Sequence, residues 1–422
     1  MAGAGEPPSS LADCRRRDCA DPLEPLVRRF RQPQGEVYLD GNSLGPPPRA
    51  AIAAVRRALE AEWAGERVAG WNTADWIGLP ARTAARIAPL IGARPDEVAV
   101  ADSVSVNLFK LAAGALALKP GRTTLLAVEG DFPTDGYMLQ GLAGLRPDIR
   151  IRTVHPSELA VALDDTVALM VASHADYRTA ALSDLAGLSR RASEAGALSL
   201  WDLSHTAGLA PIGLDAAGAD MAVGCGYKYL NGGPGAPAFV YVAQRHLAAM
   251  ADDAFAQPLS GWLGHRAPFD FVPQYEPAPG IGRFVVGTPS ILALAALECG
   301  VETVLAAGVP ALRAKSVALT ELFIELVESR CQESELRLAS PRQPARRGSQ
   351  VCFAHPQAWP VMQALIGRGV IGDFRAPDIL RFGFAPLYVS YTDTWDAAEA
   401  LREVLATRAH EAPQYAQRKA VT

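Results

Sequence analysis

Two stretches decide the fold: A-L-S-L-W-D at residues 197–202, and M-A-V-G-C-G-Y-K-Y-L-N-G-G-P-G at residues 221–235. Each opens with a short apolar run that has the character of a buried strand. The first run ends on the acid Asp202, and the second leads through small residues to Lys228. We expect neighbouring parallel strands, with both side chains at the carboxyl edge where open α/β sheets bind their ligands.

A half-desolvated lysine at that edge can act as an amine nucleophile or as a base. Such a lysine holds a carbonyl cofactor as a Schiff base. Pyridoxal phosphate also needs an acid beside its pyridinium nitrogen, so that the ring stays an electron sink. Asp202 is the candidate for that acid. These residues alone leave another interpretation open, in which Asp202 ends a strand and Lys228 caps a Gly-rich loop.

Length and composition limit the function classes. A chain of 422 residues is expected to form two or three domains. The net charge of −5, without a basic stripe, argues against nucleic acid as a partner. No apolar run is long enough to span a bilayer, and the first ten residues lack a signal-peptide layout, so we expect a cytoplasmic enzyme with no membrane partner. The six scattered cysteines form no C-x-x-C pair, which favours neither a metal nor a disulfide framework.

Strands and helices alternate from about residue 97 to 245, which predicts a mostly parallel, doubly wound sheet with helices on both faces. Helices are expected at 79–91 and 104–118, a β-turn at 129–135, and disorder over about the first 12 residues. Short strands, including 370–375 and 379–384, indicate a separate α+β domain after residue 300. We therefore predict an N-terminal arm at 1–48, a large domain at 49–299 and a small domain at 300–422.

Two further features bear on a site. Asp102 and Ser103 precede the helix at 104–118, where they serve either as caps or as the start of an anion site. Arg381 lies between apolar residues in a strand, so it is either paired within the structure or directed at a substrate carboxylate. The chain has neither G-x-G-x-x-G nor a phosphate loop ending in G-K-[ST], which disfavours a dinucleotide-dependent dehydrogenase.

Seven stretches resemble the kynureninase family, in the class V aminotransferase branch of the fold-type-I pyridoxal phosphate enzymes. They are Y-L-D-G-N-S-L-G (38–45), S-V-N-L (105–108), F-P-T-D (132–135), W-D-L-S-H (201–205), G-Y-K-Y-L-N-G-G-P-G (226–235), G-W-L-G-H (261–265) and R-F-G-F-A-P-L-Y (381–388). The resemblance runs in order from about residue 12 to 408. The first stretch together with the lysine loop is its most specific part.

The resemblance implies a role for each matching residue. Lys228 would form the Schiff base, Tyr227 would shuttle protons, and Asp202 would pair with the pyridinium nitrogen. The remaining cofactor contacts would come from Val104, Ser105, Phe132, Asp135, Ser173, His205, Trp262 and Thr288, and the substrate contacts from Arg381, Asn42 and Ser43. Trp262 and Thr288 would reach the phosphate of a neighbouring subunit, which implies a homodimer with a shared active site.

The implied activity is hydrolytic Cβ–Cγ cleavage of L-kynurenine to anthranilate and L-alanine on pyridoxal 5'-phosphate. Thr288 stands where other family members have Asn, which leaves the choice between kynurenine and 3-hydroxykynurenine open. The alternatives are a class V aminotransferase and a cysteine desulfurase. A desulfurase needs a mobile catalytic cysteine, and only Cys331 and Cys352 lie in the C-terminal region. Cys14 and Cys19 have no assigned role.

Overall fold

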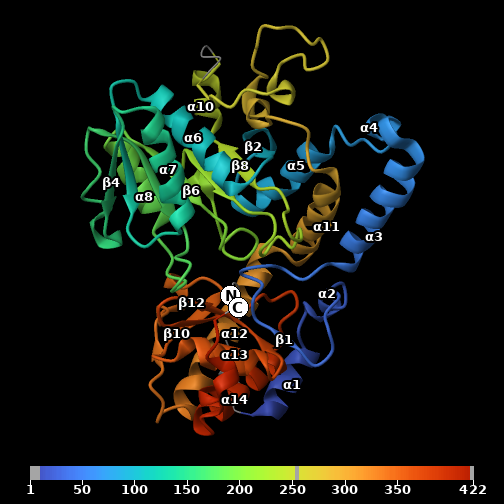
Figure 1. Ribbon diagram of the computed structural model, residues 1–422, viewed down its shortest axis with the longest axis vertical. Helices are drawn as coiled ribbons and strands as arrows, with labels where there is room; N and C mark the ends of the chain where they lie inside the picture. The colour runs from blue at the N-terminus through green and yellow to red at the C-terminus, as the bar shows by residue number, and fades with distance from the viewer. Residues whose placement is uncertain (1–9, 252–255, 419–422) are drawn as a thin grey trace.

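The computed structural model describes residues 10–251 and 256–418, and its central feature is a seven-stranded sheet (Figure 1). The strand order is β2-β8-β7-β6-β5-β3-β4. The strands are β2 (Val98–Val100), β3 (Thr124–Val128), β4 (Arg150–Val154), β5 (Val167–Ser173), β6 (Leu198–Asp202), β7 (Met221–Gly224) and β8 (Phe239–Val242). Only β8 runs against its neighbours β2 and β7, and the other pairings are parallel. The predicted mostly parallel sheet is confirmed.

Helices cover both faces of this sheet, because alternate residues of each strand point to opposite sides. On one face, α6 (Val104–Leu118) and α7 (Pro133–Leu145) pack on strand residues such as Leu125 and Leu200. On the other face, α5 (Leu79–Ile91), α8 (Leu185–Glu194) and α11 (Ile291–Ala307) pack on residues such as Met170 and Trp201. The central strands β5, β6 and β7 are buried along their whole length, as parallel strands covered on both faces must be.

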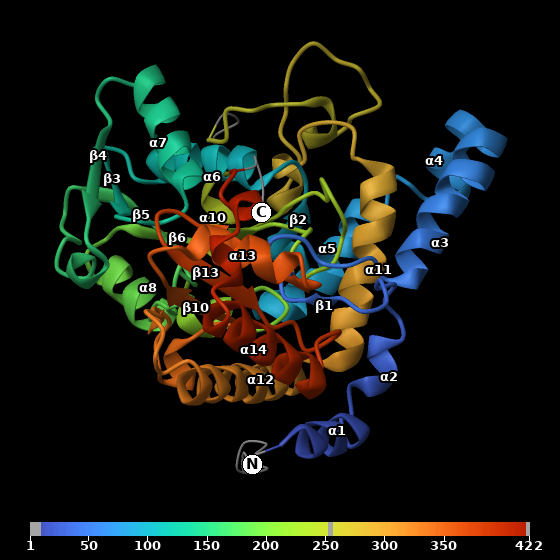
Figure 2. The ribbon, with the colours of Figure 1, turned by 60° about the horizontal axis from the view of Figure 1, so that its bottom comes forward.

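The C-terminal part contains a four-stranded antiparallel sheet of order β12-β13-β10-β9. Its strands are β9 (Arg337–Leu338), β10 (Gln350–Ala354), β12 (Asp373–Arg375) and β13 (Ile379–Gly383). Helices α12 (Val309–Arg330) and α13 (Ala358–Ile366) pack against it, and α14 (Tyr391–Ala406) packs on these two helices. Figure 2 shows α12 and α14 side by side, with α11 leading into α12. The chain bends by 80° between α11 and α12.

The N-terminal segment lies against the C-terminal part. Strand β1 (Val37–Tyr38) pairs in parallel with β11 (Val370–Ile371). The Asp18 carboxylate, at the end of α1 (Leu11–Cys19), accepts hydrogen bonds from the Tyr391 and Thr392 amides at 2.7 and 3.0 Å and so caps α14. The short helix α2 (Glu24–Val27) lies between α1 and β1 in the chain. The arm therefore carries the loop after β1 to the junction between the two sheets.

Two local expectations are wrong in part. Residues 10–12 are ordered, because Ser10 accepts a hydrogen bond from the Asp13 amide at 3.2 Å and starts α1; the rest of the predicted disordered segment, residues 1–9, lies outside the described residues. The expected β-turn at 129–135 is confirmed only at Glu129 and Gly130, because α7 begins with Pro133 at its first position. Proline is favoured there, since its missing N–H has no intrahelical partner to lose.

Within the described residues no single helix is both long and apolar enough to cross a membrane. Helices α11 and α12 meet that test only when taken together, across their bend. Their apolar side chains, Leu297 and Phe323 among them, are buried inside the protein.

Candidate active site

A cavity of about 230 Å³ opens at the carboxyl edge of the seven-stranded sheet. Ser173 and Asp202 are register partners at the ends of β5 and β6, and Lys228 follows β7. The structure brings eight of the predicted site residues into the wall of this cavity: Val104, Ser105, Phe132, Ser173, Asp202, His205, Tyr227 and Lys228. The cavity therefore joins three strand ends to the first turn of α6.

Lys228 is half-buried and makes two contacts within the cavity. Its Nζ lies 3.1 Å from His205 Nε2 and 6.0 Å from the centroid of the Phe132 ring. Burial holds the pKa of His205 well below its usual value, and the Lys228 and Arg381 charges add to this effect. His205 is therefore a neutral imidazole beside the lysine amine. Phe132 is 43% exposed, so its ring stands at the cavity mouth.

Three carboxylates lie close together behind the lysine: Asp131, Asp135 and Asp202. Asp131 accepts a hydrogen bond from the Ser173 amide at 2.9 Å, and burial followed by the charges of Asp202 and Asp176 raises its pKa to about 7. Asp135 is 4% exposed, and neither of its carboxyl oxygens has a hydrogen-bond partner among the described residues. Burial, then the Asp202 and Asp131 charges, raises its pKa well above the usual value. Such a cluster favours a protonated nitrogen beside it.

The first turn of α6 supplies an anion-binding end to the same cavity. Ser103 caps the helix by accepting a hydrogen bond from the Val106 amide at 3.4 Å. The N–H groups of Val104 and Ser105 belong to the first turn and have no intrahelical acceptor. The buried Lys110 donates to Asp102 at 2.5 Å and to the Phe284 carbonyl at 2.7 Å, which secures the turn before the helix. Unpaired N–H groups and the helix dipole together attract a phosphate.

The loop that contains Gly45 packs directly on the lysine loop. The Gly45 amide donates to the Tyr227 carbonyl at 2.9 Å. A Cβ at Gly45 would lie 2.2 Å from Asn231 Oδ1 and 2.5 Å from the Lys228 carbonyl, so no other residue fits there. The Tyr227 phenol is half-buried, and burial and its contact with Cys225 raise its pKa. Tyr227 therefore keeps its proton at neutral pH and can donate it.

Arg381 is 1% exposed and is paired inside the structure. Its Nε donates to Asp373 Oδ1 at 2.7 Å, and its Nη2 donates to Asp373 Oδ2 and, at 3.0 Å, to the Ser43 hydroxyl. Nη1 donates to the Tyr177 carbonyl at 2.7 Å, and Tyr177 lines the Lys228 cavity. Asn42, with its amide oxygen facing the guanidinium, accepts from Nη2 and Nε at 3.0 Å. The three predicted substrate residues thus form one cluster beside the cavity.

The structure does not bring Trp262 and Thr288 into the Lys228 cavity. Thr288 lines an adjoining cavity of about 270 Å³ together with Asp102 and Ser103. Trp262 is 38% exposed and contacts the edge of the Phe269 ring at 5.7 Å between centroids. A contact between these residues and a neighbouring subunit stays a prediction.

Three residues at or beside the site are not among those predicted from the sequence: Asp373, Asp131 and Gln350. Asp373 could have been found from the sequence, because pairing the two predicted strands at 370–375 and 379–384 as a hairpin places it opposite Arg381. Asp131 lies in the stretch interpreted as a β-turn. Gln350, whose amide lies 2.8 Å from His205 Nδ1, is 145 residues away in the chain, and no local pattern marks it.

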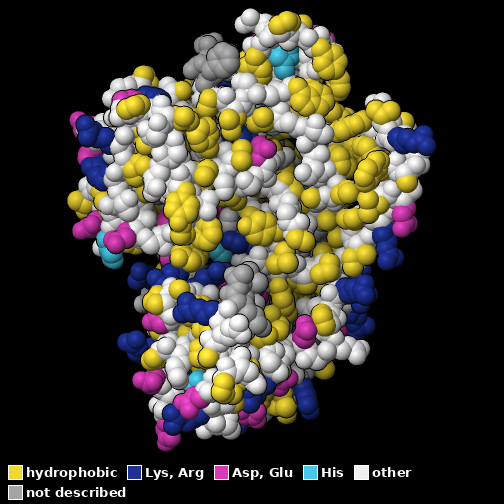
Figure 3. Space-filling model, in the orientation of Figure 1, with side chains coloured by type: hydrophobic (Ala, Val, Ile, Leu, Met, Phe, Trp, Pro, Cys, Tyr) yellow, Lys and Arg dark blue, Asp and Glu magenta, His cyan; other side chains and the backbone are white. Residues whose placement is uncertain are grey.

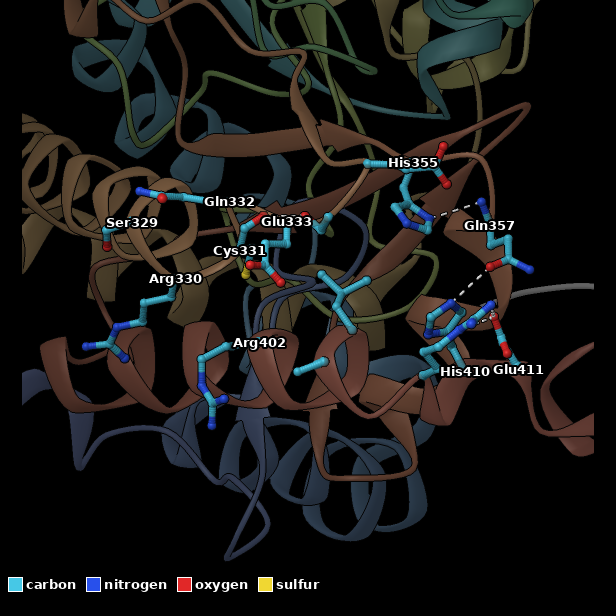
Figure 4. Close-up of a pocket in the computed structure, with 15 residues that line it drawn as sticks. Ser329, Arg330, Cys331, Gln332, Glu333, His355, Gln357, Arg402, His410 and Glu411 are labelled. Atoms are coloured by element: carbon cyan, nitrogen blue, oxygen red, sulfur yellow. Dashed lines mark hydrogen bonds and ion pairs between the residues drawn. The ribbon is translucent and has the colours of Figure 1, made fainter.

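A second cavity, of about 600 Å³, lies in the C-terminal part between the end of α12 and α14 (Figure 4). Its arginines are matched by acids: Arg330 and Arg402 lie 3.1 and 2.5 Å from Glu399, and Arg408 lies 2.6 Å from Glu411. This cavity offers no lysine and no unmatched cationic cluster among its described lining residues. It is therefore a polar surface groove, separate from the Lys228 site.

The two C-terminal cysteines do not serve the Lys228 site. Cys331 lines the groove of Figure 4, and burial raises its pKa to about 11. Cys352 lies in β10, fully buried, and burial raises its pKa to about 12. Thiols of such high pKa are poor nucleophiles at neutral pH. Across residues 10–251 and 256–418, no group of His, Cys, Asp and Glu is placed to hold a metal ion.

Comparison with solved structures gives the fold. The apo cysteine desulfurase of Thermococcus onnurineus NA1 matches with a TM-score of 0.74 at 16% identity, over 91% of this chain and 98% of that one. A variant of C-DES with glycine covalently linked to its PLP cofactor matches with a TM-score of 0.74 at 15% identity, over 89% of this chain and 98% of that one. At such low identity the likeness is one of fold alone.

Comparison by sequence is more specific. Residues 312–401 match the family described as the kynureninase C-terminal domain. The kynureninase of Burkholderia mallei (strain SAVP1) is 51% identical over 411 residues, which cover 96% of this chain and 98% of that one. The kynureninase of Pseudomonas fluorescens is 46% identical over 97% of this chain and 99% of that one. With about half of all positions identical along nearly the full length of both chains, the chain belongs to the kynureninase family.

Proposed function

We propose that this chain hydrolyses L-kynurenine between Cβ and Cγ to anthranilate and L-alanine, with 3-hydroxykynurenine as a second substrate that yields 3-hydroxyanthranilate. The observation that carries the proposal is the cavity that holds Lys228, Asp202 and the first turn of α6 together. Its relatives at 51% and 46% identity are named for this activity. The pathway served is tryptophan catabolism, and the 3-hydroxy product extends it toward NAD biosynthesis.

The residues present fit pyridoxal phosphate. The buried Asp135, with two unpartnered carboxyl oxygens behind Asp202, marks a site that favours a protonated ring nitrogen. In this proposal Asp202 pairs with that nitrogen, Val104 and Ser105 hold the phosphate, and Phe132 covers the ring. When bound through Lys228, the cofactor supplies an electron sink for the charge that develops on the substrate carbons.

The chain's own side chains then bind, orient and move protons. The free amine of Lys228 would take the proton from substrate Cα. Tyr227 donates and accepts protons at the γ-carbonyl and Cβ, a contribution of about 10²–10⁴-fold to the rate. Arg381 orients the substrate carboxylate. Its Nε–Nη2 edge is occupied by Asp373, so that carboxylate meets the Nη1 side or replaces Asp373.

The same proposal includes a homodimer with a shared active site, in which Trp262 and Thr288 reach the partner's cofactor phosphate. Support comes from exposed apolar residues around the segment that carries them, seen in Figure 3 as hydrophobic side chains in the upper part of the molecule. Those residues are Leu259 (37% exposed), Trp262 (38%), Phe269 (62%), Phe271 (79%) and Val272 (50%). Ile77 and Phe269 also line an apolar cavity of about 290 Å³. Exposed apolar surface of this kind marks a protein interface. Sedimentation analysis gives twice the mass of 44.7 kDa if the proposal holds.

The proposal has two further parts. Residues 1–48 form an arm, 49–299 the cofactor-binding domain and 300–422 the small domain, a division that follows the two sheets. A cytoplasmic location agrees with six free cysteines in the described chain, since reduced thiols are typical of that compartment.

The test is the absorbance spectrum of the purified protein, followed by addition of L-kynurenine and detection of anthranilate fluorescence. Lys228→Ala should lose both the yellow colour and turnover. The matched control is Lys119→Ala, at the far end of α6, which should keep both. Near-normal turnover in Lys228→Ala contradicts the proposal. A yellow protein that leaves kynurenine intact points instead to an aminotransferase or desulfurase activity on the same fold.

A further inference from the structure

A chain of three side chains connects the four-stranded sheet to the active-site lysine. Gln350, the first residue of β10, is 1% exposed, and its Nε2 lies 2.8 Å from His205 Nδ1. The opposite ring nitrogen, His205 Nε2, lies 3.1 Å from Lys228 Nζ. Gln350 is neither a predicted site residue nor a lining residue of the cavity, which it reaches through His205.

The chemistry of a neutral imidazole gives this contact a consequence. A neutral histidine has one N–H, and the partner at one ring nitrogen decides which nitrogen carries it. His205 is neutral because burial holds its pKa well below the usual value. The Gln350 Nε2 group is a donor, so Nδ1 must present its lone pair and the ring proton lies on Nε2. That proton faces Lys228.

We propose that Gln350 is a positioning residue that fixes the tautomer of His205, so that the imidazole donates its Nε2–H to the amine of Lys228. An amine accepts a hydrogen bond only through its lone pair, so this arrangement is open to Lys228 in its uncharged form. The uncharged amine is the form that condenses with a carbonyl compound. The part of this inference that concerns the cofactor rests on the function proposed above, and the tautomer itself does not.

Three variants separate this role from a structural one. Gln350→Leu removes the donor and leaves His205 without a tautomer preference from this side. Gln350→Glu presents carboxylate oxygens, which accept the ring proton on Nδ1 and so reverse the tautomer. The matched control is Gln363→Leu: Gln363 is a buried glutamine of α13, 7% exposed, and its Nε2 has no hydrogen-bond partner among the described residues.

The decisive measurement is a long-range ¹H–¹⁵N NMR spectrum of the cofactor-free chain with ¹⁵N-labelled histidine. His205→Asn assigns the His205 signals. The parent chain and Gln363→Leu should show the proton on Nε2, Gln350→Glu should show it on Nδ1, and Gln350→Leu should show a mixture. A parent chain with its proton on Nδ1 overturns the inference, and so does a Gln350→Glu chain identical to the parent.

A second readout follows the uptake of pyridoxal phosphate by the same four chains, from absorbance and from borohydride trapping on Lys228. Losing one net hydrogen bond is worth up to about tenfold. We therefore expect Gln350→Leu and Gln350→Glu to react up to about tenfold more slowly, with Gln363→Leu unchanged. If the parent tautomer is as predicted but no cofactor attaches to Lys228, the proposed function fails and the tautomer assignment stands. If attachment is normal in Gln350→Glu, the positioning role fails and the proposed function stands.

Discussion

Replacing Asp373 by Asn tests whether the Arg381 cluster is held by charge. Asp373 is 1% exposed and accepts hydrogen bonds from Arg381 Nε at 2.7 Å, Arg375 Nη2 at 2.7 Å and the Ser43 hydroxyl at 2.8 Å. Burial alone would raise the pKa of Asp373, but Arg381 and Arg375 outweigh it and hold the pKa below its usual value. The acid is therefore charged at neutral pH.

An asparagine at position 373 would keep one acceptor, lose the charge and direct an NH₂ group at the Arg381 guanidinium. Arg381 would then be a buried cation, itself 1% exposed, without a countercharge on its Nε–Nη2 edge. Breaking a buried ion pair in this way lowers the free energy of unfolding by about 3–5 kcal/mol. The whole free energy of unfolding of a typical protein is about 5–15 kcal/mol. We expect Asp373→Asn to lose about 3–5 kcal/mol of stability in the C-terminal part.

Urea unfolding of the cofactor-free chain, followed by tryptophan fluorescence, measures this loss. Trp359 is a local reporter, because it contacts the edge of Phe374, next to residue 373, at 5.6 Å between centroids. The control is Asp378→Asn in the same hairpin, whose partner Arg178 lies 3.8 Å away at the surface; it should change stability by less than about 1 kcal/mol. An Asp373→Asn chain within about 1 kcal/mol of the parent would refute the argument that Asp373 is the essential countercharge of Arg381.

Three further predictions follow from the structure. Burial and the Arg313 charge lower the pKa of His174 from 6.5 to about 4, so the unfolded chain binds a proton that the folded chain does not. As pH falls from 6.5 to 4, the free energy of unfolding of the parent should fall by about 3 kcal/mol through this group, and His174→Asn should lack this part of the fall. Equal dependence of the free energy of unfolding on pH in the two chains would exclude this role. Gly45→Ala would place a Cβ 2.2 Å from Asn231 Oδ1 and so shift the lysine loop; its rate of anthranilate release should fall by at least about tenfold. The control Gly65→Ala, with open space around its Cβ, should keep the parent rate. Because the pKa of Asp135 is raised, its ionised form destabilises the fold as pH rises; Asp135→Asn should therefore be more stable than the parent at neutral pH in urea but bind pyridoxal phosphate more weakly, and a less stable variant would count against the raised pKa.

The sequence predicts the sheet and the centre of the site because both depend on local patterns. The apolar runs before Asp202 and Lys228 need no distant information to be recognised as buried strands. The helices predicted at 79–91 and 104–118 agree with α5 and α6, since apolar periodicity and end signals mark both. Helix α7 departs from the predicted turn because Pro133 is compatible both with a turn and with the first position of a helix.

The remaining site contacts are long-range, and no local pattern encodes them. Gln350 contacts His205 across 145 residues and Arg381 contacts Ser43 across 338, so only the packed sheets bring these pairs together. The cluster of Asn42, Ser43 and Arg381 was predicted from a family resemblance rather than from physical reasoning. The pairing of Arg381 with Asp373 lay within reach, because it requires only the register of one hairpin.

The contact between Ser43 of the N-terminal arm and Arg381 of the C-terminal part also sets the order in which the protein can fold during synthesis. Ser43 leaves the ribosome 338 residues before its partner Arg381. At about 5–20 residues per second, the arm waits roughly 17–70 seconds for that partner, while the whole of the seven-stranded sheet is already available to fold. The lysine end of the site can therefore form on the nascent chain, whereas the end that would hold the substrate carboxylate closes last. A chain ended between residues 308 and 380 would contain all seven strands and the helices up to α11, but it would lack Arg381 and could not assemble the Arg381 cluster.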